Sequence, residues 1–203
     1  MSTSRPSPPT PPSRRAPRED RRRQIVEATL QLIAEGGVDA VTHRRVAAAA
    51  GVPLGSTTYY FESREHLIRE AFAWHLAAAQ QPLDARSPQQ ATSAEALLDF
   101  IVTVTMDEIE ARDRLLAEFE LTLFAARDAE LATILHAFDA AVTARLAEAL
   151  GALGAQAPED AGRTILQLIR GYQLDQLSLP AVDRDAFRRR LAVVLAAFLA
   201  PRP

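Results

Sequence analysis

The chain has 203 residues, no cysteine and a formal net charge of −3 at pH 7. With 48% hydrophobic residues it can fold around a core, and the missing cysteines exclude disulfides and thiolate metal sites. Its apolar runs are too short and too interrupted to span a bilayer, and no signal-peptide pattern opens the chain, so we expect a cytoplasmic protein without a membrane partner. Residues 1–65 carry ten arginines and seven carboxylates, whereas residues 66–203 carry 13 and 19. A basic head precedes an acidic body, and such a head suits a nucleic-acid partner.

The first 17 residues have the composition of a disordered tail. They include six prolines, separated mainly by serine, threonine and arginine, and cannot bury apolar surface. Two interpretations stay open for this Pro/Arg-rich segment. It is either an inert extension or an arm whose Arg14, Arg15 and Arg18 follow a DNA backbone or minor groove.

Helical periodicity starts after the tail. Apolar residues recur every three or four positions from Asp20 until Gly36 and Gly37 end a first helix. Thr42 is a good N-cap for a short second helix that ends at Ala50, and a third helix spans 54–61. Ser63 caps a long fourth helix, which we expect over 64–81.

The second and third helices have the spacing of a helix-turn-helix. In that motif two helices cross closely, so the first needs a small residue at the contact and the turn needs a glycine four positions later. Ala47 and Gly51 meet both needs, whereas a generic helical hairpin is the alternative. The third helix is short, rich in hydroxyl groups and poor in core residues, which favours a polar partner such as the DNA major groove.

The stretch from Arg22 to about Gln81 resembles the DNA-binding domain of the TetR family of bacterial regulators. The residues that carry the resemblance are Gly37, Thr42, the Ala47–Val52 turn, Phe61 and Arg64. The sequence departs from the family's usual pattern at Thr57-Thr58, where Leu-Tyr is commonest, and at Pro53, often a serine.

The resemblance implies roles for individual residues. Arg44 would reach a base edge, with guanine the best partner for its guanidinium, and Arg45 would contact a phosphate or remain solvated. Phosphates would be held by Thr42, Ser56, Tyr60 and Arg64. Bases would face Leu54, Gly55, Thr58 and Tyr59, and Tyr59 would carry more of the contact because Thr58 is short.

Beyond a polar linker at 82–90 only helical periods remain, and we expect helices over 93–110, 113–126, 128–150, 159–179 and 183–200. The fold class is therefore all-α. The TetR resemblance implies a three-helix helix-turn-helix DNA-binding domain (18–81), joined by a long helix to an α-helical ligand-sensing and dimerisation domain (82–203).

Two long apolar stripes end the chain, and each suits either a homodimer interface or an intrachain core. The stripe residues are Ile165, Ile169, Tyr172, Leu191, Leu195 and Phe198. An unknown small-molecule effector would lie among large side chains from several helices, which otherwise form plain core. These candidates are Trp74, Phe100, Met106, Phe119, Phe124 and Phe138, with Glu118, Glu120 or His136 adding polarity.

An enzyme is the main rival class. A carboxylate metal site in a helical bundle uses Glu-x-x-His, yet no acidic residue stands three positions before any of the four histidines. Nor does the sequence carry HExxH, a phosphate-binding glycine loop or a nucleophile elbow. We expect no catalysis, metal or cofactor, but a ligand-responsive repressor that binds a palindromic double-stranded DNA operator as a dimer. An activator of the same fold is the alternative.

Overall fold

The computed structural model describes residues 18–85, 88–179 and 181–200, and all regular structure within these ranges is helical. The N-terminal elements are α1 (Arg18–Gly36), the 3-10 turn η1 (Val38–Ala40), α2 (His43–Ala49), α3 (Leu54–Tyr60) and α4 (Arg64–Ala85). After η2 (Pro88–Gln90) follow α5 (Ala94–Glu110), α6 (Arg112–Ala125), α7 (Ala129–Ala152), α8 (Pro158–Gln176) and α9 (Arg184–Leu199). The all-α prediction is confirmed, while the predicted tail lies outside the described residues.

Side-chain caps fix where several helices begin. The hydroxyl of Thr42 accepts a hydrogen bond from the backbone N–H of Arg45 at 3.2 Å, and that of Ser63 accepts one from His66 at 3.0 Å. Gly37 and Gly51 adopt φ values of 71° and 63°, the left-handed region in which a Cβ is strained. These predicted caps and glycine breaks are confirmed.

The long helix α4 extends further than the sequence predicts. We expected a linker to start at Pro82, but the helix continues to Ala85, which leaves only residues 86–87 between α4 and η2. Proline removes one backbone hydrogen bond, yet its fixed φ is helical, so a helix can pass through it. In the acidic body, α8 stops at Gln176, before the predicted end at Leu179.

Two apolar cores hold the molecule together. The first is built by α1, α2 and α4 together with α6 and α7, and its largest buried side chains are Ile25, Ile33, Phe61, Leu67, Ile68, Phe72, Leu121 and Leu131. The second joins α5, α7, α8 and α9. Because the first core includes residues from both sides of position 81, the N-terminal helices are packed directly onto α6 and α7.

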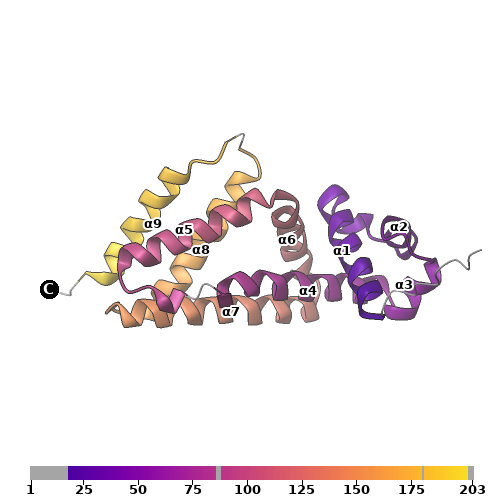
Figure 1. The fold of residues 1–203 in the computed structure, drawn as a ribbon, viewed down its shortest axis with the longest axis horizontal. Helices are drawn as coiled ribbons and strands as arrows, with labels where there is room; N and C mark the ends of the chain where they lie inside the picture. The colour runs from indigo at the N-terminus through magenta and orange to yellow at the C-terminus, as the bar shows by residue number, and fades with distance from the viewer. Residues whose placement is uncertain (1–17, 86–87, 180, 201–203) are drawn as a thin grey trace, which may run out of the picture.

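The longest helix, α7, runs beneath α4 and α8 in the view of Figure 1, and its contact with α8 is very close. A Cβ placed on Gly162 of α8 would lie 2.8 Å from the carbonyl oxygen of Thr143 on α7. Only glycine lets the two backbones approach so closely. Within the described ranges, no helix is both long and apolar enough to cross a membrane.

Candidate DNA-binding surface and ligand cavity

The turn between α2 and α3 has the predicted helix-turn-helix geometry. Val46 and Ala47 of α2 are buried, and the N–H of Val52 donates to the carbonyl of Ala47 at 3.0 Å across the turn at Gly51. Phe61, just after α3, is fully buried in the first core. The short helix α3 is therefore held by its inner side and its C-terminal end, which leaves its other face free.

That free face of α3 presents the residues that the sequence assigns to DNA bases. Tyr59 is 69% exposed and Leu54 50% exposed, Thr58 is exposed, and a Cβ on Gly55 would meet nothing within 4 Å. Ser56 and Tyr60, assigned to phosphates, are partly buried at the edge of this face. The side chains of Leu54, Thr58 and Tyr59 are therefore accessible to a partner surface.

The unusual Thr57-Thr58 pair divides between the two sides of α3. Thr57 is fully buried, and its hydroxyl is satisfied by donating to the carbonyl of Leu54 at 2.8 Å. Thr58 points outward, with only a 3.4 Å contact to the carbonyl of Gly55. The departure from the family's pattern thus changes a core residue and a surface residue at once.

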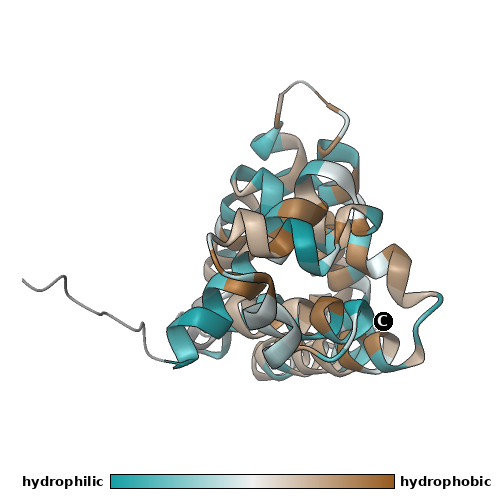
Figure 2. Ribbon diagram, turned by 90° about the vertical axis from the view of Figure 1, so that its right-hand side faces the viewer, coloured by the Kyte–Doolittle hydropathy of each residue, from teal (hydrophilic) through white to brown (hydrophobic). Residues whose placement is uncertain are grey.

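Exposed arginines lie on α2 and at the start of α1, the two helices that lead into or lie near α3. Arg44 and Arg45 are exposed on α2, next to the exposed cap Thr42. The guanidinium of Arg18, the first residue of α1, lies 5.5 Å from the centroid of the Tyr59 ring, a cation–π distance. Figure 2 looks onto this end of the molecule and shows the hydrophilic first turns of α1. This surface has the charge that a DNA backbone requires.

Arg64 makes hydrogen bonds inside the protein. Its guanidinium donates to the carbonyl oxygens of Val38 at 2.8 Å and Val41 at 2.9 Å, and it lies 3.4 Å from the carboxylate of Asp39. Those bonds fix η1, and with it the start of α2, to the first turn of α4. Sequence reasoning assigned Arg64 only a phosphate, because a link across more than 20 residues leaves no local signal.

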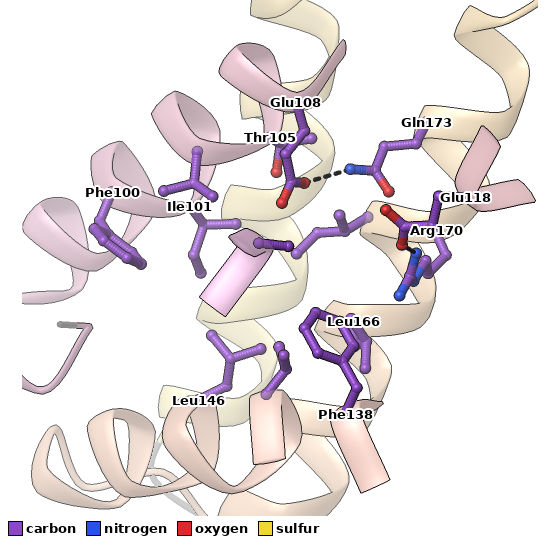
Figure 3. Close-up of a pocket in the computed structure, with 14 residues that line it drawn as sticks. Phe100, Ile101, Thr105, Glu108, Glu118, Phe138, Leu146, Leu166, Arg170 and Gln173 are labelled. Atoms are coloured by element: carbon purple, nitrogen blue, oxygen red, sulfur yellow. Dashed lines mark hydrogen bonds and ion pairs between the residues drawn. The ribbon is translucent and has the colours of Figure 1, made fainter. Parts of the chain in front are cut away.

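Two adjoining cavities lie behind the helix-turn-helix. The larger cavity has a volume of about 210 Å³, and its walls come from α1, α4, α5 and α6. The smaller cavity has about 60 Å³ and lies between α5, α7 and α8 (Figure 3). Four residues line both cavities: Ala79, Val104, Glu108 and Glu118. The two cavities are therefore neighbouring parts of one internal site.

A buried polar network crosses this site. Glu118 of α6 accepts from Nε2 of His75 on α4 at 3.0 Å and forms an ion pair with Arg170 of α8. Arg170 also reaches Asp139 of α7 at 3.2 Å. Burial alone would raise the pKa of Glu118, but His75 and Arg170 outweigh it and lower that pKa to about 2.

Glu108 of α5 has a different environment. Its carboxylate accepts a hydrogen bond from the amide of Gln173 at 2.5 Å, which is a neutral partner (Figure 3). Burial, together with the nearby negative charge of Glu118, raises the pKa of Glu108 to about 7. The two carboxyl groups in this site thus differ: the site favours the ionised form of Glu118 and the protonated form of Glu108.

Three of the six predicted ligand-binding side chains line this site, namely Trp74, Phe100 and Phe138. The others, Met106, Phe119 and Phe124, belong to or pack against the two cores instead. Of the predicted polar groups, Glu118 lines both cavities, whereas Glu120 lies beside Gly37 and His136 is exposed. Helical phase alone does not distinguish a side chain that lines a cavity from one in contact with a neighbouring helix.

The sequence did not single out His75, Glu108, Arg170 or Gln173 as ligand-site residues, although all four line the cavities. A charged residue on the apolar side of an amphipathic helix was the available signal. Among the residues that the structure describes, no three His, Asp or Glu side chains are grouped closely enough to hold a metal ion.

The predicted dimer stripes face inward in this chain. Ile165, Tyr172, Leu191 and Leu195 are buried in the second core, Phe198 packs against that core, and Ile169 lines the smaller cavity. These side chains form the intrachain core that was the alternative interpretation. Other apolar residues of α8 and α9 are exposed instead, with Leu174 53% and Val193 70% accessible.

The helix-turn-helix leaves one face of α3 free, and it is packed onto an α-helical domain that encloses a cavity. This combination defines the class of helix-turn-helix transcriptional regulators. Two family models match this chain. "Bacterial regulatory proteins, tetR family" matches residues 25–71, and "Tetracyclin repressor-like, C-terminal domain" matches residues 88–201. The chain belongs to the TetR family of transcriptional regulators.

Individual relatives agree with the family assignment. The HTH-type transcriptional repressor KstR of Rhodococcus jostii is 44% identical over 55 residues, 27% of this chain and 26% of that protein. A transcriptional regulator of Streptomyces coelicolor A3(2) is 28% identical, with a TM-score of 0.69 over 87% of this chain and 98% of that one. The multidrug binding protein EbrR, in complex with ethidium, is 26% identical, with a TM-score of 0.70 over 86% and 98% of the two chains. The matches to curated relatives span only 26% to 59% of their lengths.

Proposed function

We propose that this protein is a ligand-responsive repressor that binds a palindromic double-stranded DNA operator as a homodimer. The observation that carries the proposal is the free face of α3, where Leu54, Thr58 and Tyr59 are exposed beside the arginines of α2. A helix of seven residues with such a face fits the major groove, which is wide enough to admit a helix. Because the DNA target lies in the cytoplasm of a bacterium, we place the protein there.

The residues divide into base readers and backbone anchors. Arg44 has an exposed guanidinium on α2, and a bidentate contact to guanine is its best geometric match. Thr58, Tyr59, Leu54 and Gly55 would approach the other base edges. Phosphates would be held by Thr42, Arg45, Ser56, Tyr60 and the remaining donor capacity of Arg64.

A homodimer would use the outer sides of α8 and α9. Their exposed apolar residues, Leu174 and Val193, lie opposite the stripes that are buried in the second core. A two-fold axis through such a surface buries the same patch on both subunits. It would also place two copies of α3 about 34–36 Å apart, one turn of DNA. A chain that stays monomeric at micromolar concentration by light scattering would contradict this part of the proposal.

The effector would occupy the joined cavities. Their walls are mostly apolar with a few convergent polar groups, which is the usual build of a small-molecule site. A structural relative, the multidrug binding protein EbrR, binds ethidium, which supports a small organic effector here. Repression is favoured over activation because the curated relative KstR is named a repressor.

DNA binding can be tested with a labelled duplex of the chain's own upstream intergenic region, followed by fluorescence anisotropy at several salt concentrations. Affinity should fall steeply with salt, since the logarithm of the binding constant drops by about 0.9 per neutralised phosphate for each tenfold rise in salt. Arg44→Ala should reduce the preference for the footprinted operator over scrambled DNA by about ten- to hundredfold. Arg163→Ala, an exposed arginine on α8, is the matched control. Equal losses in both variants would refute the assignment of α2 and α3 as readers.

Repression and activation separate in a reporter assay. A promoter fusion to the footprinted operator should be expressed more strongly in a deletion strain if the protein represses. Lower expression in the deletion strain would make it an activator. An unchanged reporter would refute regulation at that operator.

A further inference from the structure

Four arginines stand at the beginning of α1, at positions 18, 21, 22 and 23. The N-terminus of a helix carries a partial positive charge, so its dipole disfavours cations there. Two acidic residues, Glu19 and Asp20, lie in the same turn and offset part of this repulsion. Since local helix energetics oppose the arginines, their contacts with other elements are the more informative feature.

Arg18 lies against the two tyrosines that end α3. The central carbon of its guanidinium is 5.5 Å from the centroid of the Tyr59 ring and 6.0 Å from that of the Tyr60 ring. The two rings meet edge to face, with centroids 5.1 Å apart and an angle of 83° between their planes. A cation is attracted to an aromatic ring at such distances. One guanidinium is therefore within cation–π distance of both rings of a T-shaped pair.

Arg22, one turn further along α1, has a different environment. Its guanidinium lies 5.8 Å from the centroid of the Phe61 ring and forms an ion pair with Glu70 of α4. Phe61 is fully buried in the first core, so Arg22 links α1 to α4 inside the domain. Arg18 instead contacts Tyr59, which is 69% exposed on the free face of α3. The two arginines thus act on different parts of the motif, Arg22 on its fold and Arg18 on its outer surface.

The orientation of the Tyr59 ring matters because this side chain is the largest one on the free face of α3. An exposed side chain without contacts samples several rotamers, and ordering it when a partner binds costs free energy. A ring that is already held in place avoids that cost. Tyr60 and Arg18 are the residues whose side chains contact the Tyr59 ring. Arg18 therefore supplies, from another helix, a contact that restrains this ring before DNA arrives.

We propose that Arg18 is a positioning residue for base recognition, whose guanidinium holds the Tyr59 ring against Tyr60 in the orientation that meets the base edges. The proposal rests on the proposed DNA-reading role of α3 and adds a residue of α1 that sets its specificity. An Arg18 that only neutralised a phosphate would strengthen binding to every sequence alike. An Arg18 that positions Tyr59 strengthens binding where Tyr59 finds its preferred base pair.

The test is fluorescence anisotropy of the full chain on the footprinted operator, on scrambled DNA and on a set of duplexes that each change one base pair of the operator. The proteins are the wild type, Arg18→Met, Tyr59→Leu and the double variant. The control is Arg23→Met, which removes an exposed arginine of the same turn that pairs with Asp20 and Glu27 inside α1. Arg18 and Tyr59 are both exposed, so the variants should fold, and urea unfolding checks this.

Arg18→Met should lower the ratio of operator affinity to scrambled-DNA affinity. An exposed cation–π contact corresponds to about a two- to fivefold effect in each subunit, so two subunits on one operator give about five- to twenty-fivefold. The preference should be lost at the same base pairs in Arg18→Met as in Tyr59→Leu. The double variant should lose no more preference than Tyr59→Leu alone, because the two residues act as a unit. Arg23→Met should keep the wild-type ratio.

Several results would overturn the positioning role. An equal loss on every duplex, with a salt dependence that is shallower by about 0.9 per subunit, would make Arg18 a backbone anchor. Additive losses in the double variant, or an unchanged ratio in Arg18→Met, would also overturn it. A wild type without any preference for the operator would refute DNA reading by α3, and the positioning role with it. A wild-type preference that Arg18→Met retains would refute the positioning role alone.

Discussion

Replacing Glu108 with glutamine should stabilise the ligand-free protein, and only at high pH. Glutamine has the shape of the protonated carboxyl, so it keeps a polar partner for Gln173 but never carries the buried negative charge. The pKa of Glu108 in the folded chain, about 7, lies above the ordinary glutamate value of 4.5. Folding therefore favours the protonated form of Glu108.

The sign and size of the effect follow from linkage. Between pH 4.5 and about 7 the folded chain holds a proton on Glu108 that the unfolded chain has lost, so stability falls as pH rises through this range. The full difference between the two pKa values corresponds to about 3 kcal/mol, at 1.36 kcal/mol per pKa unit. Glu108→Gln should recover about 3 kcal/mol at pH 8.5 and less than about 1 kcal/mol at pH 5.

Urea unfolding followed by circular dichroism measures this difference at both pH values. Glu110→Gln, on the exposed side of the same helix, controls for the loss of one negative charge in general. A gain that is the same at pH 5 and pH 8.5 would refute the linkage argument. A loss of stability at pH 8.5 would show that the ionised carboxylate has a partner that stabilises it.

Three further predictions concern single contacts. Glu118→Gln should destabilise the fold by about 3–5 kcal/mol, because His75 and Arg170 lose their shared buried carboxylate. Because the pKa of Glu118 is lowered to about 2, its contribution to stability is present above pH 4.5 and disappears as pH falls toward 2. A Glu118→Gln variant that unfolds like the wild type at pH 7 would contradict the predicted loss. Gly162→Ala should destabilise by about 1–3 kcal/mol in thermal melts, because the added Cβ meets the Thr143 carbonyl at 2.8 Å; Gly171→Ala, where nothing lies within 4 Å, is the control. Arg64→Met should lower both stability and affinity for all DNA sequences, since it frees η1 from α4; unchanged urea unfolding of this variant would limit the role of Arg64 to phosphate binding.

The helix-turn-helix could be predicted from sequence because its signals are local. A capping threonine at 42, a small residue at 47 and a glycine at 51 each determine geometry within a few residues of themselves. Helix order in the acidic body followed from the period of apolar residues in the same way. The end of α4 was missed because Pro82 is a break signal by composition, whereas a proline can remain within a helix.

The cavity and the outer surface depend on contacts between distant helices. Periodicity predicted Tyr172 and Leu191 for a dimer interface with an intrachain core as the alternative, and the structure buries both in the second core. The sequence suggested Glu118 as one of three polar groups for the pocket, but it did not single out Glu108. Their importance appears only when α4, α5, α6 and α8 converge and leave one carboxyl paired with cations and the other paired with an amide.

The same helices that line the larger cavity also hold the helix-turn-helix. Leu30 of α1 lies in the cavity wall, α4 begins at the arginine that binds η1, and α6 contacts both α1 and η1. Glu120 of α6 lies against Gly37, the residue between α1 and η1. A ligand changes the DNA-binding geometry only if it binds one arrangement of these helices better than another. Because Glu118 joins α6 to α4 and α8, a ligand in the cavities that perturbs this network acts on the helices that position α2 and α3.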